Sequence, residues 1–301
     1  MSYKERLVSI AKLCGADYEE DCDLSALCSY RTGGRADCRI SPATEEQLKT
    51  VVEELKAAEL PYFYLGCGSN VLASDEGYRG AVICTDKLKG LSVSGKIITA
   101  YAGEKVADLV KFALMCSLGG AEFLNGIPAS VGGVVAMNAG CYGKSVADIC
   151  SYAVSASGVY AAKDCGFAYR ESRFKKTNDG VIKAAFHLEN AEYDQSEAKA
   201  EYYRNLRKNK QPKGRSCGST FKNDGYYAGK VIESCNLKGV RIGSARVSEK
   251  HANFILADPK AKSADIYSLI NLIKKTVKDK TGIELEEEIE FLGSFSDENN
   301  F

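Results

Sequence analysis

The chain has little of several features on which common functions depend. It has two histidines, no net charge, and no apolar run approaching the about 20 residues that a membrane helix needs. Because 40 basic residues balance 40 acidic ones, no overall field draws the protein to nucleic acid or to a membrane surface. Neither His187 nor His251 lies near Ser219 in sequence, so a Ser-His-Asp hydrolase is poorly supported. We therefore expect neither a nucleic-acid nor a membrane partner.

The cysteines are numerous but lack an organised pattern. The twelve are scattered without the paired spacing of metal sites, so we expect no bound metal. The first residues, Met1–Arg6, are charged and lack the apolar core of a signal peptide. We therefore expect a cytoplasmic protein in which cysteines such as Cys84 and Cys116 are reduced core side chains.

Glycine is abundant in one segment, residues 123–143, where small and apolar residues alternate with almost no charge. Glycines lack the Cβ atoms that would block a pyrophosphate or a ring system, which favours backbone pressed against a ligand. A buried loop whose glycines only serve tight turns is an equally good interpretation of this segment alone.

A second glycine segment, Tyr64–Leu72, follows a short apolar strand expected at 61–64. A strand that leads into a glycine turn is a common phosphate site. The segment differs from the Rossmann fingerprint because Val71 replaces the third glycine and no clear helix follows through residues 73–77.

The apolar periodicity predicts helices and strands mixed along the chain. A capping box at Thr44 and Gln47 begins a helix with an apolar stripe through Leu55. Gly119 and Gly120 are expected to end a helix that begins near Val106. Further helices are expected at 3–12, at 229–235 and over 266–277, the last ending at Gly282. Strands are expected at 36–40, 81–84, 97–101, 254–256 and 285–291.

Short motifs lie along the chain at Leu65–Leu72, Asn125–Gly140, Tyr169–Phe174, Arg207–Pro212, Cys217–Asn223, Ala228–Lys230, Val247–Phe254 and Glu288–Gly293. Together they resemble the motifs of the bacterial UDP-N-acetylenolpyruvoylglucosamine reductases, a family of peptidoglycan precursor synthesis, and they occur in that family's order. Most are weak singly, but together they cover the chain from Tyr30 to Gly293. The approach to Ser219 resembles the compact subtype, which lacks an extra tyrosine-bearing loop over the substrate.

The resemblance implies an α+β fold with a two-part FAD-binding region of the vanillyl-alcohol-oxidase (PCMH) type and a smaller α+β substrate-binding domain. The first flavin subdomain is expected at 1–85, joined by a C-terminal strand at 285–293, and the second at 86–207. The substrate-binding domain is expected at 208–284 and a polar tail at 294–301.

The resemblance also implies an NADPH-dependent flavoenzyme that reduces UDP-N-acetylglucosamine enolpyruvate to UDP-N-acetylmuramate. Hydride passes from flavin N5 to the enolpyruvyl β-carbon, and Ser219 matches the donor that protonates the α-carbon. A hydroxyl is a weak acid, so a cation such as Lys222 or Arg215 must stabilise its alkoxide. Arg170 matches the residue that meets the substrate carboxylate and the developing enolate. Glu288 matches the acid that polarises the enolpyruvyl group.

The same resemblance implies the binding residues. Those for FAD are Arg31, Gly33, Gly34, Gly66, Gly68, Ser69, Asn70, Gly126, Ile127, Pro128, Ser130, Gly132, Gly133, Asn138 and Gly140. Those for the UDP-sugar substrate are Tyr169, Arg207, Gln211, Lys222 and Asn223. No flavin segment contains a histidine, so FAD is expected to bind noncovalently, and the protein is expected to be a monomer.

Two alternatives stay open at this point. Another FAD-linked oxidoreductase of the same fold, acting on an alcohol or a lactone, would not need Ser219, Arg170 and Glu288 together. A non-catalytic flavin-binding or nucleotide-binding protein would show no turnover. The chain also departs from the family pattern at Ala129, in place of a glycine, and at Cys141 and Asp224.

Overall fold

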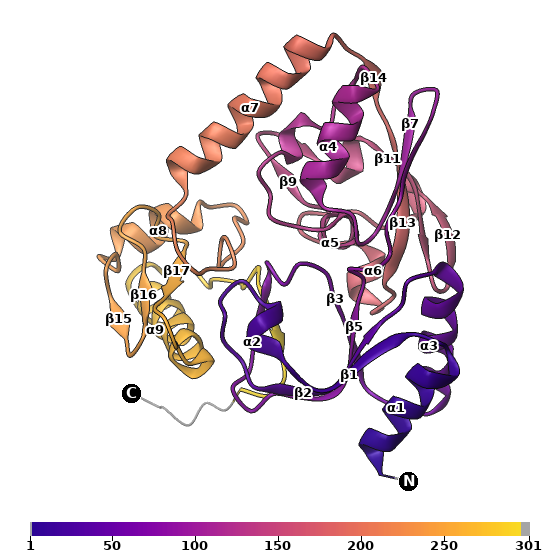
Figure 1. Ribbon diagram of the computed structural model, residues 1–301. Coiled ribbons are helices and arrows are strands. Elements are labelled where there is room, and N and C mark those ends of the chain that lie inside the picture. The colour runs from indigo at the N-terminus through magenta and orange to yellow at the C-terminus, as the bar shows by residue number, and fades with distance from the viewer. Residues whose placement is uncertain (1, 296–301) are drawn as a thin grey trace. The chain divides into compact units, whose positions relative to one another are not determined.

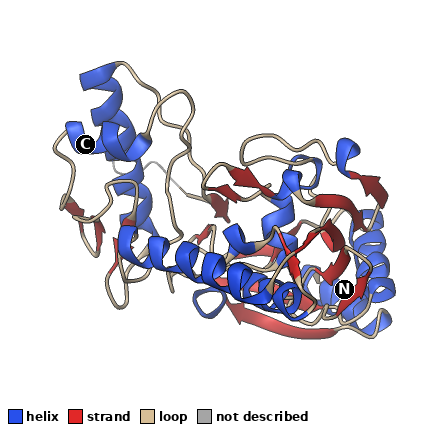
Figure 2. Cartoon of the chain, turned by 90° about the horizontal axis from the view of Figure 1, so that it is seen from above, coloured by secondary structure: helices blue, strands red, loops and turns tan. Residues whose placement is uncertain are grey.

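The computed structural model describes residues 2–295, which divide into two compact units. Among these residues, unit 1 comprises 2–20, 38–67 and 80–209, and unit 2 comprises 21–37, 68–79 and 210–295. Helices and strands are mixed in both units (Figures 1 and 2), which confirms the predicted α+β class. Of the predicted polar tail, residues 296–301 lie outside the described residues.

One part of unit 1 is built on a four-stranded sheet with the order β1-β2-β5-β3. Its core packs α1 and α3 with buried residues of the sheet, among them Cys38, Ala81 and Ile83. Helix α3 begins after Thr44, whose hydroxyl accepts the Gln47 amide as predicted. The other half of the capping box differs, because the Gln47 side-chain oxygen accepts the Ala43 amide and not that of Thr44. The elements are α1 (Tyr3–Leu13), β1 (Asp17–Asp23), β2 (Arg35–Ser41), α3 (Glu45–Ala57), β3 (Tyr62–Leu65) and β5 (Tyr78–Cys84).

The other part of unit 1 is an antiparallel five-stranded sheet with the order β12-β11-β13-β7-β6. Helices α4 and α5 pack against it around a second core that includes Phe123 and Phe186. The strands are β6 (Leu91–Ser94), β7 (Ile97–Tyr101), β11 (Cys150–Ser155), β12 (Gly158–Ala161) and β13 (Val181–His187). The helices are α4 (Val106–Met115), α5 (Val131–Ala136) and α6 (Arg173–Lys176), and the short strands are β8 (Leu118–Gly119), β9 (Gly140–Cys141), β10 (Lys144–Ser145) and β14 (Glu189–Asn190).

The predicted end of α4 at Gly119 and Gly120 is wrong. The helix ends at Met115, and the amide of Cys116 already closes on carbonyls of the last turn. Leu118 and Gly119 instead form β8, which pairs with β14. These two residues pair with a strand about 70 residues further along the chain, and the local glycine pattern cannot predict such a pairing.

Helix α7 (Tyr193–Lys210) is not among the helices that the apolar periodicity predicts. Only Ser196 and Ala200 are buried along its 18 residues, so no apolar stripe marks it. The amphipathic pattern that predicts most helices is absent here because the helix is polar on nearly all sides.

Unit 2 has a single core in which α9 packs on a small antiparallel sheet with the order β15-β16-β17. Tyr30 and Leu72 join this core, which explains why residues 21–37 and 68–79 cluster with the C-terminal region. The predicted final strand is shorter than expected and pairs in parallel with β4. The elements are α2 (Leu24–Leu27), β4 (Val71–Ala73), α8 (Ala228–Ser234), β15 (Arg241–Ile242), β16 (Ala245–Val247), β17 (Ile255–Ala257), α9 (Ser263–Thr281) and β18 (Glu290–Leu292).

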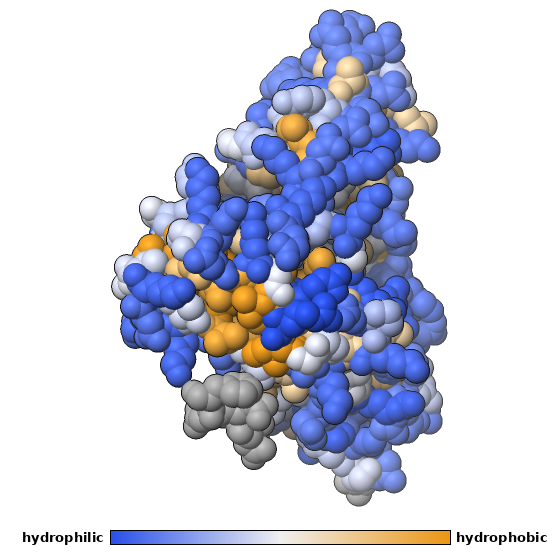
Figure 3. All heavy atoms as spheres, turned by 90° about the vertical axis from the view of Figure 1, so that its left-hand side faces the viewer, coloured by the Kyte–Doolittle hydropathy of each residue, from blue (hydrophilic) through white to orange (hydrophobic). Residues whose placement is uncertain are grey.

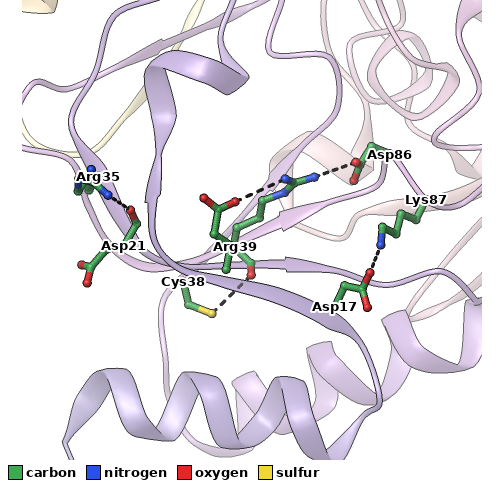
Figure 4. Close-up of polar contacts among 8 residues, drawn as sticks. Asp17, Asp21, Arg35, Cys38, Arg39, Asp86 and Lys87 are labelled. Atoms are coloured by element: carbon green, nitrogen blue, oxygen red, sulfur yellow. Dashed lines mark hydrogen bonds and ion pairs between the residues drawn. The ribbon is translucent and has the colours of Figure 1, made fainter.

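Ion pairs lie along the first sheet but contribute little to its stability. Arg39 on β2 bonds Asp86 at 2.8 Å and approaches Glu19 at 3.7 Å, and Lys87 pairs with Asp17 (Figure 4). Exposed pairs of this kind contribute about 0–1 kcal/mol each, so apolar packing holds the sheet.

The surface drawn in Figure 3 is mainly hydrophilic, with apolar residues gathered in a patch bordered by polar ones. Within residues 2–295, none of the helices has both the length and the apolar character of a membrane span.

Candidate functional site

The Ser219 loop of unit 2 is held at both ends by backbone pairing. Arg215 bridges to Ala257 on β17, and the Thr220 amide donates to the Asn253 carbonyl at 2.8 Å. Gly218 adopts φ +77°, a conformation that a residue with a Cβ rarely takes. Ser219 therefore lies, half-buried, between a glycine turn and a residue whose backbone is hydrogen-bonded to Asn253.

Asn253 fixes the backbone of Phe221, two residues after Ser219. Its side-chain oxygen accepts the Phe221 amide at 2.9 Å, and its side-chain nitrogen donates to the Phe221 carbonyl at 2.8 Å. Asn253 is 1% exposed, so both bonds are shielded from water. Sequence analysis did not single out Asn253, although it lies in the matching segment Val247–Phe254.

The chain near its C-terminus runs beside the Ser219 segment. The Glu288 amide donates to the Thr220 carbonyl at 2.8 Å, the Lys222 amide donates to the Glu286 carbonyl at 2.8 Å, and Phe221 bridges to Glu287. These pairings bring two of the three predicted catalytic residues, Ser219 and Glu288, into one local structure.

Asn70, predicted to bind FAD, also bonds the backbone of this C-terminal segment. Its side-chain amide donates to the Glu288 carbonyl at 3.0 Å, and its own carbonyl accepts the Glu290 amide at 2.8 Å. The neighbouring Ser69 is half-buried. The predicted flavin segment and the predicted catalytic strand are therefore directly bonded within unit 2.

Three predicted substrate residues lie nearby in sequence but differ in environment. Lys222 is 7% exposed, and its ammonium bonds Glu286 at 2.5 Å. Asn223 is exposed, and its side-chain oxygen accepts the Ala228 amide that begins α8. Gln211 is half-buried at the start of unit 2.

In unit 1 the two predicted flavin segments meet. A Cβ added to Gly66, in the turn after β3, would lie 2.3 Å from the hydroxyl oxygen of Ser130. Ser130 caps α5 by accepting the Gly133 amide at 3.3 Å. Two glycine-rich backbones thus approach each other closely, and this convergence fits the requirements of a dinucleotide such as FAD.

Packing within the protein itself requires glycine at most of the glycine positions predicted to bind flavin. A Cβ would lie less than 3.0 Å from another residue at each of six positions: Gly33, Gly34, Gly66, Gly68, Gly132 and Gly140. At Gly132 the neighbour is Ala102. The interpretation that glycine only clears space for a ligand is therefore incomplete, because these glycines are also required for the loops to form.

Arg170 lies at the tip of a tight turn that abuts the glycine run. It adopts φ +57°, and its guanidinium donates to the Gly140 carbonyl at 3.1 Å and lies 5.1 Å from the Tyr169 ring. Buried Asn138 supports the turn by donating to the Ala168 carbonyl at 2.9 Å. A non-glycine residue held at positive φ is typical of functional sites.

Arg207, predicted to bind substrate, forms hydrogen bonds with the glycine-rich segment 123–143. Its guanidinium donates to the carbonyls of Phe123 and Asn125 at 3.3 and 3.2 Å and to the Cys141 sulfur at 2.7 Å. Its side chain also lies 3.2 Å from a Cβ added to Gly126. Of the other predicted flavin residues here, Ile127 packs partly buried on the core and Pro128 is exposed.

Burial changes the pKa of two side chains in unit 2, Tyr30 and Cys28. It raises the pKa of Tyr30 well above its ordinary value, and it raises the pKa of the Cys28 thiol to about 12. Both groups are therefore neutral near pH 7. In the part of the chain that the structure describes, no group of three or more acidic, histidine or cysteine side chains is arranged to hold a metal ion.

Comparisons with known proteins agree with this geometry. Residues 36–162 match the family model described as "FAD binding domain", and residues 210–292 match "UDP-N-acetylenolpyruvoylglucosamine reductase, C-terminal domain". The predicted FAD-binding region is thereby confirmed.

Named relatives cover nearly the whole chain. UDP-N-acetylenolpyruvoylglucosamine reductase of Staphylococcus aureus is 39% identical over 89% of this chain and 90% of its own length. The enzyme of the same name from Caldanaerobacter subterraneus is 38% identical over 88% and 90%. The crystal structure of the Thermus caldophilus reductase superposes with a TM-score of 0.78 at 31% identity, covering 92% of this chain and 98% of that one.

Proposed function

The chain belongs to the UDP-N-acetylenolpyruvoylglucosamine reductase family, and from this membership we propose that it reduces UDP-N-acetylglucosamine enolpyruvate to UDP-N-acetylmuramate with NADPH. The reaction supplies a precursor of peptidoglycan. The observation that carries the proposal is the pairing of the Ser219 segment with Glu286–Glu288 in unit 2.

FAD is proposed to be held noncovalently where the Gly66 turn meets Ser130, with Asn138 and Gly140 supporting the same glycine run. When bound, FAD supplies the transfer of reducing equivalents from NADPH to the enolpyruvyl group. The protein residues bind and orient the reactants and provide the proton.

Ser219 is proposed to donate the proton that the α-carbon of the enolpyruvyl group receives. Support comes from its placement, because the loop is anchored by Arg215 and Thr220 and leaves the serine half-buried. A hydroxyl held beside the substrate carbon transfers its proton with a smaller loss of entropy, because the two groups are already oriented.

Glu288 and Arg170 are proposed to act on the charge of the enolpyruvyl group. The Glu288 amide is bonded to the Thr220 carbonyl, so the backbone of Glu288 lies beside the residue that follows Ser219. Arg170 offers a planar guanidinium that stays charged and bonds a carboxylate through two parallel hydrogen bonds. Its positive φ and its bond to Gly140 hold the turn that carries it.

Tyr169, Arg207, Gln211, Lys222 and Asn223 are proposed to complete the substrate site. Lys222 is held by Glu286, and Arg207 by carbonyls of the glycine run, so each is positioned before substrate arrives. We also propose a monomer located in the cytoplasm, which light scattering and cell fractionation would test.

The test is a flavin-monitored reaction with the purified protein. NADPH should bleach the yellow flavin, and the enolpyruvyl sugar nucleotide should restore its absorbance with formation of UDP-N-acetylmuramate. A colourless protein, or a flavin that the sugar nucleotide does not reoxidise, would overturn the proposal.

A further inference from the structure

Tyr30 is a buried tyrosine of unit 2 that the proposed mechanism does not use. It is 1% exposed and belongs to the same core cluster as Cys217 and Phe221, which lie on either side of Ser219 in sequence. Its place before Arg31, in a segment that the resemblance assigns to FAD, gives it no catalytic signal. A buried tyrosine hydroxyl usually meets a polar partner, so the groups around this one decide what it stabilises.

The Tyr30 hydroxyl faces two residues of the serine loop. Its polar neighbours are the Thr220 hydroxyl and the backbone of Cys217. Among residues 2–295, neither the Tyr30 nor the Thr220 hydroxyl has a hydrogen-bond partner elsewhere. Because Cys217 lies two residues before Ser219 and Thr220 one residue after it, the contacts of a single side chain span the serine.

The Cys217 side of the loop is also held by its thiol. The thiol donates to the Val71 carbonyl at 3.1 Å, and the backbone of Tyr30 lies against the same sulfur. Burial raises the pKa of the Cys217 thiol, so it stays a protonated donor near pH 7. Cys217 is therefore a fixed point from which the turn toward Ser219 begins.

Packing alone does not restrict the turn at Gly218. A Cβ added there would meet no atom within 4 Å, and the residue adopts φ +77°. Glycine has more conformational freedom than any other residue, so the backbone next to Ser219 needs polar contacts to hold one position. The contacts of Tyr30 with Cys217 and Thr220 bracket this glycine and narrow the positions that the serine can take.

We propose that the Tyr30 hydroxyl is a positioning group for Ser219, an inference that rests on the proposed function. It touches no reactant and acts through Cys217 and Thr220. A misplacement of about 1 Å can slow a reaction about 100-fold, so a looser loop should slow proton transfer while the substrate still binds. Tyr30 therefore matters in the half of the reaction that uses Ser219.

The test is Tyr30→Phe, which removes the hydroxyl and keeps the ring that fills the core. NADPH should bleach the flavin at a near-normal rate, because that half of the reaction does not use Ser219. Reoxidation by the sugar nucleotide should slow about tenfold, with its KM changed less than about twofold. Stopped-flow flavin absorbance and steady-state kinetics measure these effects, and a residue needed only for stability would not divide the two halves in this way.

Tyr267→Phe is the matched control, because it removes a tyrosine hydroxyl from the same unit. Tyr267 packs partly buried on the same core, beside Phe291 and Phe295. This variant should leave both halves of the reaction unchanged.

Thr220→Val removes the opposite hydroxyl, keeps the shape of the side chain and should also slow reoxidation. The double variant Tyr30→Phe/Thr220→Val should reoxidise no more slowly than the slower single variant, because both changes break one contact. Its resistance to urea should exceed that of either single variant, since no buried hydroxyl is left without its partner. Slow reoxidation in a protein of recovered stability would separate positioning from folding.

Wild-type reoxidation in Tyr30→Phe, or equal slowing of both halves, would overturn the inference. Multiplied effects in the double variant would overturn it as well. If Tyr30→Phe does not fold, Thr220→Val decides by the same comparison of the two halves. These outcomes concern only Tyr30 as long as the wild type converts the sugar nucleotide, whereas a wild type without that turnover would overturn the proposed function.

Discussion

The Glu288 amide donates to the Thr220 carbonyl at 2.8 Å, although 68 residues separate the two positions in sequence (288 minus 220). This bond places the predicted acid and the predicted proton donor on adjacent backbone segments of unit 2. Removing Ser219 should therefore affect chemistry without disturbing the backbone that carries it.

Ser219→Ala should slow only the second half of the reaction. NADPH should bleach the flavin at a near-normal rate, whereas reoxidation by the sugar nucleotide should slow by about 10²–10⁴, the usual effect of a positioned general acid. Ser219→Cys should keep part of that step because a thiol can also donate a proton. Stopped-flow flavin absorbance follows each half.

The control for this experiment is Ser216→Ala, which alters another half-buried serine of the same loop. It should leave both halves unchanged. Equal slowing of both halves in Ser219→Ala would remove Ser219 from the role of proton donor.

Arg170→Lys should lose most of its turnover with the sugar nucleotide. A lysine keeps the charge and fits the same positive φ no worse, but it cannot form two parallel hydrogen bonds with a carboxylate. Steady-state kinetics measure the effect. Arg173→Lys is the control, because the Arg173 guanidinium lies over the Tyr160 ring, 3.5 Å from its centre, and is not a predicted site residue. Near-normal turnover in Arg170→Lys would show that two parallel hydrogen bonds from Arg170 to the carboxylate are not needed.

Gly66→Ala should destabilise the protein and lower flavin occupancy, because the new Cβ would lie 2.3 Å from the Ser130 hydroxyl oxygen. Overpacking of this kind costs about 1–3 kcal/mol. Ser130→Ala alone should cost about 1 kcal/mol through loss of the α5 cap.

The double variant Gly66→Ala/Ser130→Ala should be more stable than the sum of the single effects predicts, because the next atom, the Ser130 Cβ, lies 3.5 Å away. Urea denaturation and the flavin-to-protein absorbance ratio measure stability and occupancy. Strict additivity would contradict the close approach of the two segments.

Asn253→Leu should destabilise unit 2 by about 2 kcal/mol or more. The amide and carbonyl of Phe221 would lose their partners while buried, and each unmet group costs about 1–3 kcal/mol. Denaturation of the flavin-loaded protein measures the loss. Unchanged stability would show that water replaces the side chain.

His251 should make stability depend on pH below neutrality. Burial, with the nearby Lys238 charge, lowers its pKa from the ordinary value of 6.5. The unfolded chain then binds a proton more readily than the folded one, so stability is full above pH 6.5 and falls as the pH decreases toward the lowered folded value. His251→Asn should flatten this part of the curve, measured by denaturation at pH 5 to 8. An unchanged slope would exclude His251 as its source.

The sequence by itself determined the elements whose signals are local. The cap at Thr44, the apolar stripe of α9 and the left-handed Gly282 that ends it all act within a few residues, and the structure has them as predicted. The family motifs likewise pointed to the FAD-binding region and to the family, which the comparisons bear out.

Only the tertiary structure decided where those elements pair. Glu288 cannot be distinguished from Glu286 and Glu290 by local pattern. In the structure the Glu288 amide bonds Thr220, the residue after Ser219, whereas the backbone of Glu286 bonds Lys222 and that of Glu290 bonds Asn70. Likewise, the need for glycine at position 66 depends on Ser130. Such constraints arise from hydrogen bonds and steric contacts between distant segments, which exist only once the chain has folded.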